Sequence, residues 1–347
     1  MKLLFSCLVL TTMLRAQETF PVNGVADKRD GCYAFTNATI VKDAQNTITN
    51  GNLVIRDGKI IAVGTNVSIP KDAVVIDCKD KFIYPSFIDI YSDYGMPQIQ
   101  RPTGGGFGGP AQLTSNQKGA YGWNQAIKTD VNAYKLFSVD DAKAKTLREA
   151  GFGTVLTHQR DGIARGTGTV VTLASEKENF VIVKDKASAH YSFSKGSSTQ
   201  TYPSSLMGSI ALLRQTYNDA AWYKNNPEAA SKEGYNITLK YFNDQQTLPQ
   251  IFEAQDRGVD LWNLMRADRI GDEFGVQYII KATGKEYQRI KEVAATKAPL
   301  IVNLNFPQAQ DVEDPNDARL VSLADMKNWE LGPSNPAAIE KRVFPSA

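Results

Sequence analysis

The stretch Phe82-Ile83-Tyr84-Pro85-Ser86-Phe87-Ile88-Asp89 marks the point at which the pattern of the sequence changes. Downstream of it, apolar runs such as Thr154-Val155-Leu156 and Pro299-Leu300-Ile301-Val302 alternate with stretches of helical period. Apolar strands separated by helices indicate a mainly parallel sheet that is covered on both faces. A barrel and a doubly wound sheet both satisfy this pattern, and we favour the barrel within an α/β fold class.

The helical period predicts six helices in this part of the chain. They are Ser138 to Ala150, Ser204 to Tyr223, Thr247 to Arg257, Ala267 to Phe274, Gly284 to Thr296 and Leu323 to Glu330. A long loop, Pro97 to Asn132, contains the glycine-rich run Gly104 to Gly109. No Gly-Lys-Ser/Thr follows this run, so we interpret it as a surface loop and not as a phosphate cradle.

Upstream of Phe82, the sequence is typical of short strands and turns. Gly51 to Ile55 and Ile60 to Gly64 flank the turn Arg56-Asp57-Gly58-Lys59, and Asp-Gly between two β-branched runs predicts a hairpin. The sequence therefore predicts a small antiparallel β-sandwich domain over residues 17–80, followed by a barrel-like domain over residues 81–347.

The first sixteen residues have the order of a secretory signal peptide: Lys2, an apolar stretch, and small residues ending at Ala16. The apolar stretch is shorter than the roughly 20 residues of a membrane anchor. Cleavage near Ala16 removes Lys2 and Arg15 from the 39 basic residues, which then balance the 37 acidic ones. We expect an exported protein, periplasmic or secreted, without a membrane anchor or affinity for nucleic acid.

Two cysteines, Cys32 and Cys78, remain after cleavage. An oxidising compartment permits a disulfide between them without requiring one.

Several segments together resemble the amidohydrolase superfamily of metal-dependent hydrolases, in particular its imidazolonepropionase-like branch. They are Asn52 to Gly64 with Val75-Ile76-Asp77, Phe82 to Asp89, Glu149 to Val155, and Arg266-Ala267-Asp268-Arg269-Ile270. The resemblance covers nearly all of the chain after residue 16. It implies a (β/α)₈ barrel of the TIM type with one or two divalent metals, usually zinc, at the carboxyl ends of its strands. Metal-bound water then hydrolyses a carbon–nitrogen bond, because coordination brings the pKa of water to about 7.

Histidines are missing where this resemblance calls for metal ligands. Tyr91 and Asp93 stand where the first His-x-His pair is expected, and Asn263 and Met265 stand at the second pair. Lys281-Ala282 replaces a His-Gly sequence, so Ala282 is another degenerate position. A binuclear site uses about four histidines, whereas the chain contains two, His158 and His190. We therefore expect no metal cofactor in this chain and no catalysis by it alone.

Two residues, Asp93 and His158, remain candidates for a catalytic role. Asp93 has the strand spacing that places it on one side with Asp89 and Tyr91, which permits a metal oxygen ligand or a general base. His158 falls near a strand end, while His190 lies in a polar stretch that we interpret as an edge strand or loop. A lone histidine is more often structural than a ligand.

The sequence contains about six barrel strands, and the last one is Leu300 to Leu304. A parallel barrel needs its last strands to pair with its first, because open edges leave backbone groups unpaired. Either the chain is a fragment of a longer protein, or a second amidohydrolase domain or protomer completes the barrel.

Three functions remain open from the sequence. The first is a non-catalytic amidohydrolase scaffold, a pseudoenzyme that packs against an active partner. The second is a metal-dependent hydrolase of amide or cyclic amide bonds with a reduced site of Asp93 and His158. The third is an exported ligand-binding module, in which Tyr91, Trp123 and Trp262 line an apolar pocket.

Overall fold

The computed structural model describes residues 31–100, 111–254 and 261–343, and its side chains through residue 341. It divides into two compact units that meet between Pro85 and Ser86. The stretch predicted to be a signal peptide, residues 1–16, and the glycine-rich run lie outside the described residues. Among the residues that are described, no helix has the length and apolar character needed to cross a bilayer.

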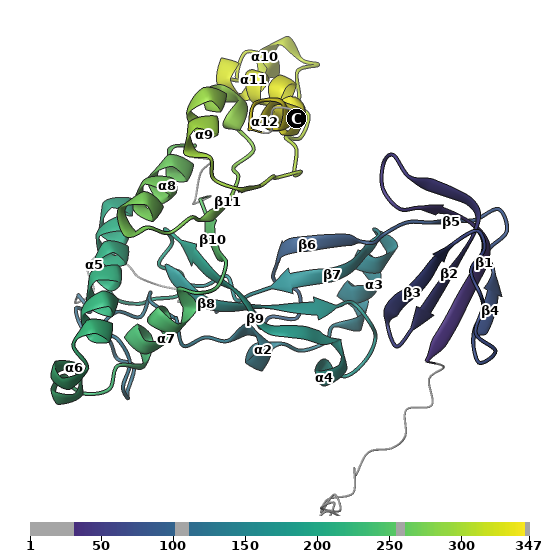
Figure 1. Ribbon diagram of the computed structural model, residues 1–347. Helices are drawn as coiled ribbons and strands as arrows, with labels where there is room; N and C mark the ends of the chain where they lie inside the picture. Colours follow the sequence, from purple (N-terminus) through teal and green to yellow (C-terminus); the bar gives the residue numbers. More distant parts are fainter. Residues whose placement is uncertain (1–30, 101–110, 255–260, 344–347) are drawn as a thin grey trace, which may run out of the picture. The chain divides into compact units, whose positions relative to one another are not determined.

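The first unit is one five-stranded sheet (Figure 1). Its strands are β1 (Cys32–Val41), β2 (Thr47–Arg56), β3 (Lys59–Gly64), β4 (Val74–Asp77) and β5 (Phe82–Ile83). The predicted hairpin is confirmed as β2 and β3. Asp57 and Gly58 form its turn with φ of 49° and 73°, and such left-handed geometry is what Asp-Gly tolerates.

The pairing in this unit is mixed and not purely antiparallel as we predicted. β4 and β5 both run parallel to β1, because each is reached through a crossover and not through a hairpin turn from β1. Phe82 and Ile83 therefore belong to the first sheet, and the second unit begins its own sheet at Phe87. Cys32 and Cys78 are buried as free thiols in two different apolar clusters.

The second unit contains a seven-stranded sheet in the order β12-β11-β10-β9-β8-β7-β6. Its strands are β6 (Phe87–Ser92), β7 (Phe152–Thr157), β8 (Ala164–Thr172), β9 (Ile182–Ser192), β10 (Gln250–Glu253), β11 (Ile279–Lys281) and β12 (Leu300–Ile301). All neighbours are parallel except β8, which runs antiparallel to both β7 and β9. The sheet is thus an incomplete, barrel-like α/β sheet with β6 and β12 at its edges.

Helices and short 3₁₀ segments fill the connections of the second unit. They are α2 (Ala133–Leu136), α3 (Asp141–Glu149), α4 (Glu178–Val181), α5 (Leu206–Asn225), α6 (Pro227–Glu233), α7 (Ile237–Gln245), α8 (Trp262–Phe274), η1 (Glu286–Arg289), α9 (Ile290–Thr296), α10 (Pro315–Ala318), α11 (Leu323–Leu331), η2 (Gly332–Ser334) and α12 (Asn335–Val343). Figure 1 shows α9 to α12 gathered beyond β11. Five of the six predicted helices are confirmed within a few residues.

The prediction of a helix over Thr247 to Arg257 was wrong for the part that the structure describes, because Gln250–Glu253 form strand β10; residues 255–257 lie outside the described residues. Four consecutive buried residues, Gln250 to Glu253, continue the parallel sheet there, and sheet pairing on both sides outweighs the local helical period. His190 was also misassigned to an edge, since β9 lies inside the sheet between β8 and β10.

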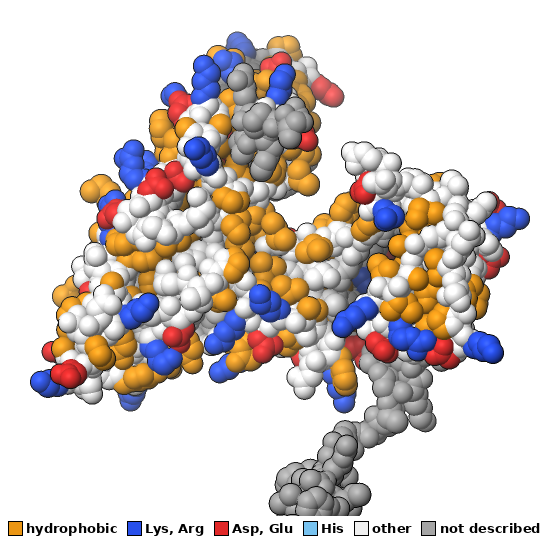
Figure 2. All heavy atoms as spheres, viewed as in Figure 1, with side chains coloured by type: hydrophobic (Ala, Val, Ile, Leu, Met, Phe, Trp, Pro, Cys, Tyr) orange, Lys and Arg blue, Asp and Glu red, His pale blue; other side chains and the backbone are white. Residues whose placement is uncertain are grey.

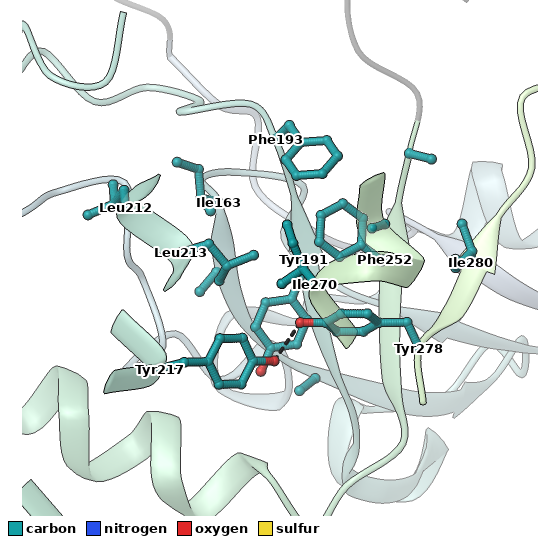
Figure 3. Close-up of a cluster of buried hydrophobic side chains, with 14 of the residues drawn as sticks. Ile163, Tyr191, Phe193, Leu212, Leu213, Tyr217, Phe252, Ile270, Tyr278 and Ile280 are labelled. Atoms are coloured by element: carbon teal, nitrogen blue, oxygen red, sulfur yellow. Dashed lines mark hydrogen bonds between the residues drawn. The ribbon is translucent and has the colours of Figure 1, made fainter. Parts of the chain in front are cut away.

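The largest core packs one face of this sheet against α5, α7 and α8 (Figure 3). Tyr191, Phe252 and Ile280 come from three neighbouring strands, and Leu213 and Tyr217 come from α5. The alternation of side chains along β9 explains why the two faces of the sheet differ. In the stretch Ser188-Ala189-His190-Tyr191-Ser192-Phe193, the apolar residues face this core and the polar residues face the other side. The polar face of the sheet is where the candidate site lies.

Candidate functional site

The carboxyl ends of the parallel strands bring together seven polar side chains. They are Tyr91 of β6, His158 and Arg160 just after β7, Arg165 at the start of β8, His190 of β9, Glu253 at the end of β10 and Lys281 at the end of β11. Because β8 is antiparallel, its first residues lie at the same edge as the last residues of its neighbours. We call these seven residues the strand-end cluster.

Glu253 is the centre of the cluster. Its Oε2 accepts a hydrogen bond from Arg165 Nη1 at 2.8 Å, and its Oε1 accepts from Arg160 Nη2 at 2.7 Å and from Lys281 Nζ at 3.2 Å. The side chains of Glu253 and Arg165 are 6% and 5% exposed. The three cations hold the pKa of Glu253 at about 2, against the opposing effect of its burial.

Tyr91 connects the cations to the first strand of the sheet. Its hydroxyl accepts a hydrogen bond from Arg165 Nη1 at 3.0 Å. Lys281 Nζ lies 4.4 Å from the centre of the Tyr91 ring, and Arg160 Cζ lies 5.4 Å from it. Burial raises the pKa of Tyr91, so its phenol stays neutral.

The two histidines stack face to face behind Tyr91. Their ring centres are 3.6 Å apart with an angle of 9°, and the Tyr91 ring meets His158 edge-on at 4.8 Å. His190 Nε2 shares a hydrogen bond of 2.8 Å with Ser188 Oγ. Neither nitrogen of His158, nor Nδ1 of His190, has a hydrogen-bond partner among the described residues.

Burial keeps both imidazoles neutral. It lowers the pKa of His158 well below its ordinary value, and His190, Arg165, Arg160 and Lys281 lower it further. Burial and Arg165 lower the pKa of His190 to about 3. Gly168 of β8 makes room for this pair, because a Cβ there would lie 2.6 Å from His190 Nε2 and 2.7 Å from Ser188 Oγ.

The residues of the cluster do not fit a divalent metal ion. In the described ranges, no group of three or more His, Cys, Asp or Glu side chains is arranged to hold one. Glu253, the carboxylate whose charge raises the pKa of His190 against the larger effects of burial and Arg165, already receives three cationic donors. A divalent ion beside His158 would meet the same three positive charges that lower the pKa of that histidine.

The candidates Asp93 and His158 differ in their surroundings. Asp93 follows β6 and is exposed, whereas the side chain of His158 is fully buried, although its backbone N–H donates a hydrogen bond to the carbonyl of Ser92. Asp93 is close enough to Arg160 to raise the pKa of the guanidinium. Asp89 instead accepts a hydrogen bond from the Tyr91 backbone N–H.

The other positions singled out from the sequence lie at different places. Asn263 and Met265 are in helix α8 and not at a strand end, where Asn263 accepts a hydrogen bond from Arg266. Ala282 directly follows β11 and is buried. The strand that precedes α8 in the chain is β10, and its last residue, Glu253, belongs to the cluster.

The aromatic residues predicted to line one pocket have different neighbours. Trp123 stacks on Tyr202 and borders a cavity of about 110 Å³ beside α5 and α7. Trp262 lies under Arg289 at 5.4 Å, and Tyr91 contacts the histidine pair. The contacts of these three aromatic residues are thus with different parts of the second unit.

Sequence reasoning missed three of the seven residues of the cluster. Arg160, Arg165 and Glu253 belong to no motif, and Glu253 fell inside a wrongly predicted helix. Lys281 was noted only because it directly precedes the degenerate position Ala282. The alternation of Ser188, His190 and Ser192 with apolar residues was the signal for an internal strand.

No protein-family model matches this sequence, and no curated protein sequence matches it. Among solved structures, the chain is similar to an amidohydrolase from Thermotoga maritima, with a TM-score of 0.60 and 19% identity over 90% of this chain and 91% of that one. Another amidohydrolase gives a TM-score of 0.38 at 12% identity, covering 90% and 76% of the two chains. A prolidase solved with N-methylphosphonate-L-proline gives 0.36 at 11%, covering 90% and 75%. The first similarity establishes an amidohydrolase-like fold.

Proposed function

We propose that this chain is a non-hydrolytic protein on an amidohydrolase-like fold, in which an ion-pair cluster stands at the strand ends in place of a metal centre. The observation that carries the proposal is the three cationic donors on Glu253. They occupy the one buried carboxylate of the cluster and surround the histidines with positive charge. The chain would act as a scaffold or binding protein and not as a hydrolase.

The protonation states of the cluster support this proposal. A general acid or base works best when its pKa is near the operating pH. The pKa of His190 is about 3 and that of Glu253 about 2, while the pKa of Tyr91 is raised. Lys281 is the member whose pKa moves down towards neutrality, because of its burial, and its ion pair with Glu253 opposes that shift.

Hydrolysis assays test this proposal directly. The purified chain is incubated with dipeptides and with cyclic amides, in the presence of zinc or manganese and after treatment with a chelator. We expect no turnover above that of the double variant Asp93→Ala/His158→Ala. Metal-stimulated turnover that this double variant loses would establish the alternative, a hydrolase with a reduced site.

A second proposal concerns the edges of the sheet. We propose that a second amidohydrolase-type domain or a second protomer supplies strands that pair with β6 and β12. Phe87, Ile88 and Ile90 of the edge strand β6 are 66%, 62% and 43% exposed, and apolar side chains of this kind favour contact with a partner. Figure 2 shows that apolar side chains reach the surface of both units.

Light scattering over a range of concentrations tests the protomer form of this proposal. We expect self-association that Ile88→Lys/Ile90→Lys abolishes. The control is Val183→Lys, since Val183 is 64% exposed but belongs to the internal strand β9. A chain that stays monomeric throughout contradicts a partner protomer.

Export is a further proposal, which rests on the order of charged, apolar and small residues before Gln17. Expression of the full chain with its own N-terminus should give a mature protein that begins at Gln17. Sequencing of the N-terminus checks this, and a chain that keeps Met1 to Ala16 contradicts it.

A further inference from the structure

We infer that the solvent-facing side of the strand-end cluster, formed by Arg160 and Lys281 beside the Tyr91 ring, binds a small oxyanion: the carboxylate or phosphate group of a ligand. The inference deepens the proposed function and rests on it, because it requires that the cluster holds no metal.

Charge is the first observation. The cluster contains three cations, Arg160, Arg165 and Lys281, and one carboxylate, Glu253. The histidines and Tyr91 are neutral. Asp93 adds one exposed negative charge near Arg160, so the positive charges still outnumber the negative ones. Partly desolvated positive charge in excess attracts an anion more strongly than the same charge in water.

The second observation is the division of the cluster into a buried pair and an open pair. Arg165 and Glu253 are buried and neutralise each other. Arg160 and Lys281 keep 38% and 17% of their side chains exposed, so they are the two cations of the cluster that solvent reaches most. A guanidinium has five donors and an ammonium has three, and each uses one of them on Glu253.

The third observation is that the open cations converge. Arg160 Nη2 and Lys281 Nζ both reach the same oxygen, Oε1 of Glu253, at 2.7 and 3.2 Å. Two nitrogens that share one acceptor are close enough for a single oxyanion to bridge them. Both groups also lie on the Tyr91 ring, which restricts where they point. The site is thus formed before a ligand arrives, which favours binding.

A structural role alone does not require this arrangement. A buried ion pair is satisfied by one cation for one carboxylate, and further cations add repulsion as well as attraction. The second and third cations here come from different elements, the β7–β8 connection and the end of β11. A ligand anion would offset their repulsion.

Titration calorimetry on the full chain after treatment with a chelator tests the inference. The probes are inorganic phosphate and acetate, with sodium chloride at matched ionic strength as the reference. We expect saturable binding of at least one probe, and the stronger of the two identifies a phosphate or a carboxylate ligand. Removal of metal beforehand ensures that the protein's own cations make the contacts.

The variants Arg160→Gln and Lys281→Gln should each weaken binding by about tenfold or more, because each removes a charge-assisted donor. The matched controls are Arg214→Gln and Lys240→Gln, whose side chains form ion pairs of 2.6 and 2.8 Å elsewhere and are about as exposed as Arg160. Asp93→Asn should tighten binding, since it removes a nearby negative charge.

Circular dichroism identifies any variant that does not fold. If Lys281→Gln is one of these, the test of anion binding rests on Arg160→Gln, at the more exposed cation, and on Asp93→Asn. The inference is overturned if neither probe binds saturably, or if the cluster variants bind like the controls. In both cases the non-hydrolytic assignment stands, because it depends on metal and turnover and not on anion affinity.

Discussion

Glu253 determines the character of the strand-end cluster at the scale of single residues. It is 6% exposed and binds one buried and two partly exposed cations. The substitution Glu253→Gln keeps the shape but leaves the cations without their counter-charge. We expect it to lower the free energy of unfolding by about 3 to 5 kcal/mol, measured by urea denaturation.

Glu273→Gln is the matched control for that substitution. Glu273 pairs with Arg214 at 2.6 Å, but both side chains are about two-fifths exposed. An exposed pair contributes about 1 kcal/mol or less. Equal losses for the two variants would show that Glu253 does not hold a buried network together.

The histidine pair predicts a dependence of stability on pH. In the unfolded chain, each histidine takes up a proton near pH 6.5, whereas in the folded chain both pKa values are lowered, that of His190 to about 3. The free energy of unfolding is therefore unaffected by the histidines above pH 6.5. It falls as the pH drops from 6.5 towards 3, because the unfolded chain binds protons that the folded chain does not. Each histidine contributes a slope of about 1.4 kcal/mol per pH unit within that window.

The chain has two histidines in all, so His158→Phe should remove about half of this slope. Phe replaces an imidazole whose nitrogens have no partner among the described residues, and we expect it to cost little at neutral pH. Urea denaturation between about pH 5 and about pH 7 measures the slope. The same slope in the variant would mean that His158 is not protected from protonation.

Sequence-based prediction placed residues correctly in the fold where an apolar strand ends. His158, expected near a strand end, directly follows β7, and Lys281 is the last residue of β11. It failed for Arg160 and Arg165, because long cationic side chains reach partners on other strands, and local sequence does not specify those contacts. Glu253 was missed because its pairing partners lie about 28 and 61 residues away, in β11 and β9.

Strand β8 is the unexpected element of the second sheet. It lies antiparallel between β7 and β9 and brings Arg165 and Gly168 to the cluster. The glycines at 166 and 168 weaken the strand signal of its first half, so the place of that half depends on pairing with the neighbouring strands. The helices were easier to predict, since an amphipathic period and a cap, such as Ser205 before α5, are local.

Gly168 gives a prediction for this element. Gly168→Ala places a methyl group within 2.7 Å of Ser188 Oγ and His190 Nε2 inside the sheet. We expect a loss of about 1 to 3 kcal/mol in the free energy of unfolding, because the side chains that it meets are buried. Thermal and urea denaturation measure the loss.

Gly64→Ala serves as the control. It also changes a strand glycine, but the nearest atom to its added Cβ is 3.6 Å away, an ordinary contact. A substitution of that kind raises the free energy of unfolding by about 0.4 to 1 kcal/mol. If Gly168→Ala is as well tolerated as the control, the histidine pair is not packed against β8.

For the molecule as a whole, the sequence predicts more of the fold than of the function. The order of a small β unit followed by alternating strands and helices is local information, and the structure confirms it as an amidohydrolase-like α/β fold. The boundary shifted by a few residues, because Phe82 and Ile83 pair with β1. Fold alone does not assign an activity, since the chemistry depends on the side chains at the strand ends.

Those side chains form a cationic cluster with two neutral histidines. Titration of zinc into the chelator-treated full chain measures whether this cluster excludes a metal ion. We expect no stoichiometric binding tighter than about micromolar, because three cations lie near His158 and the buried carboxylate already accepts three hydrogen bonds. One equivalent of tightly bound zinc that is lost in His158→Phe would contradict it.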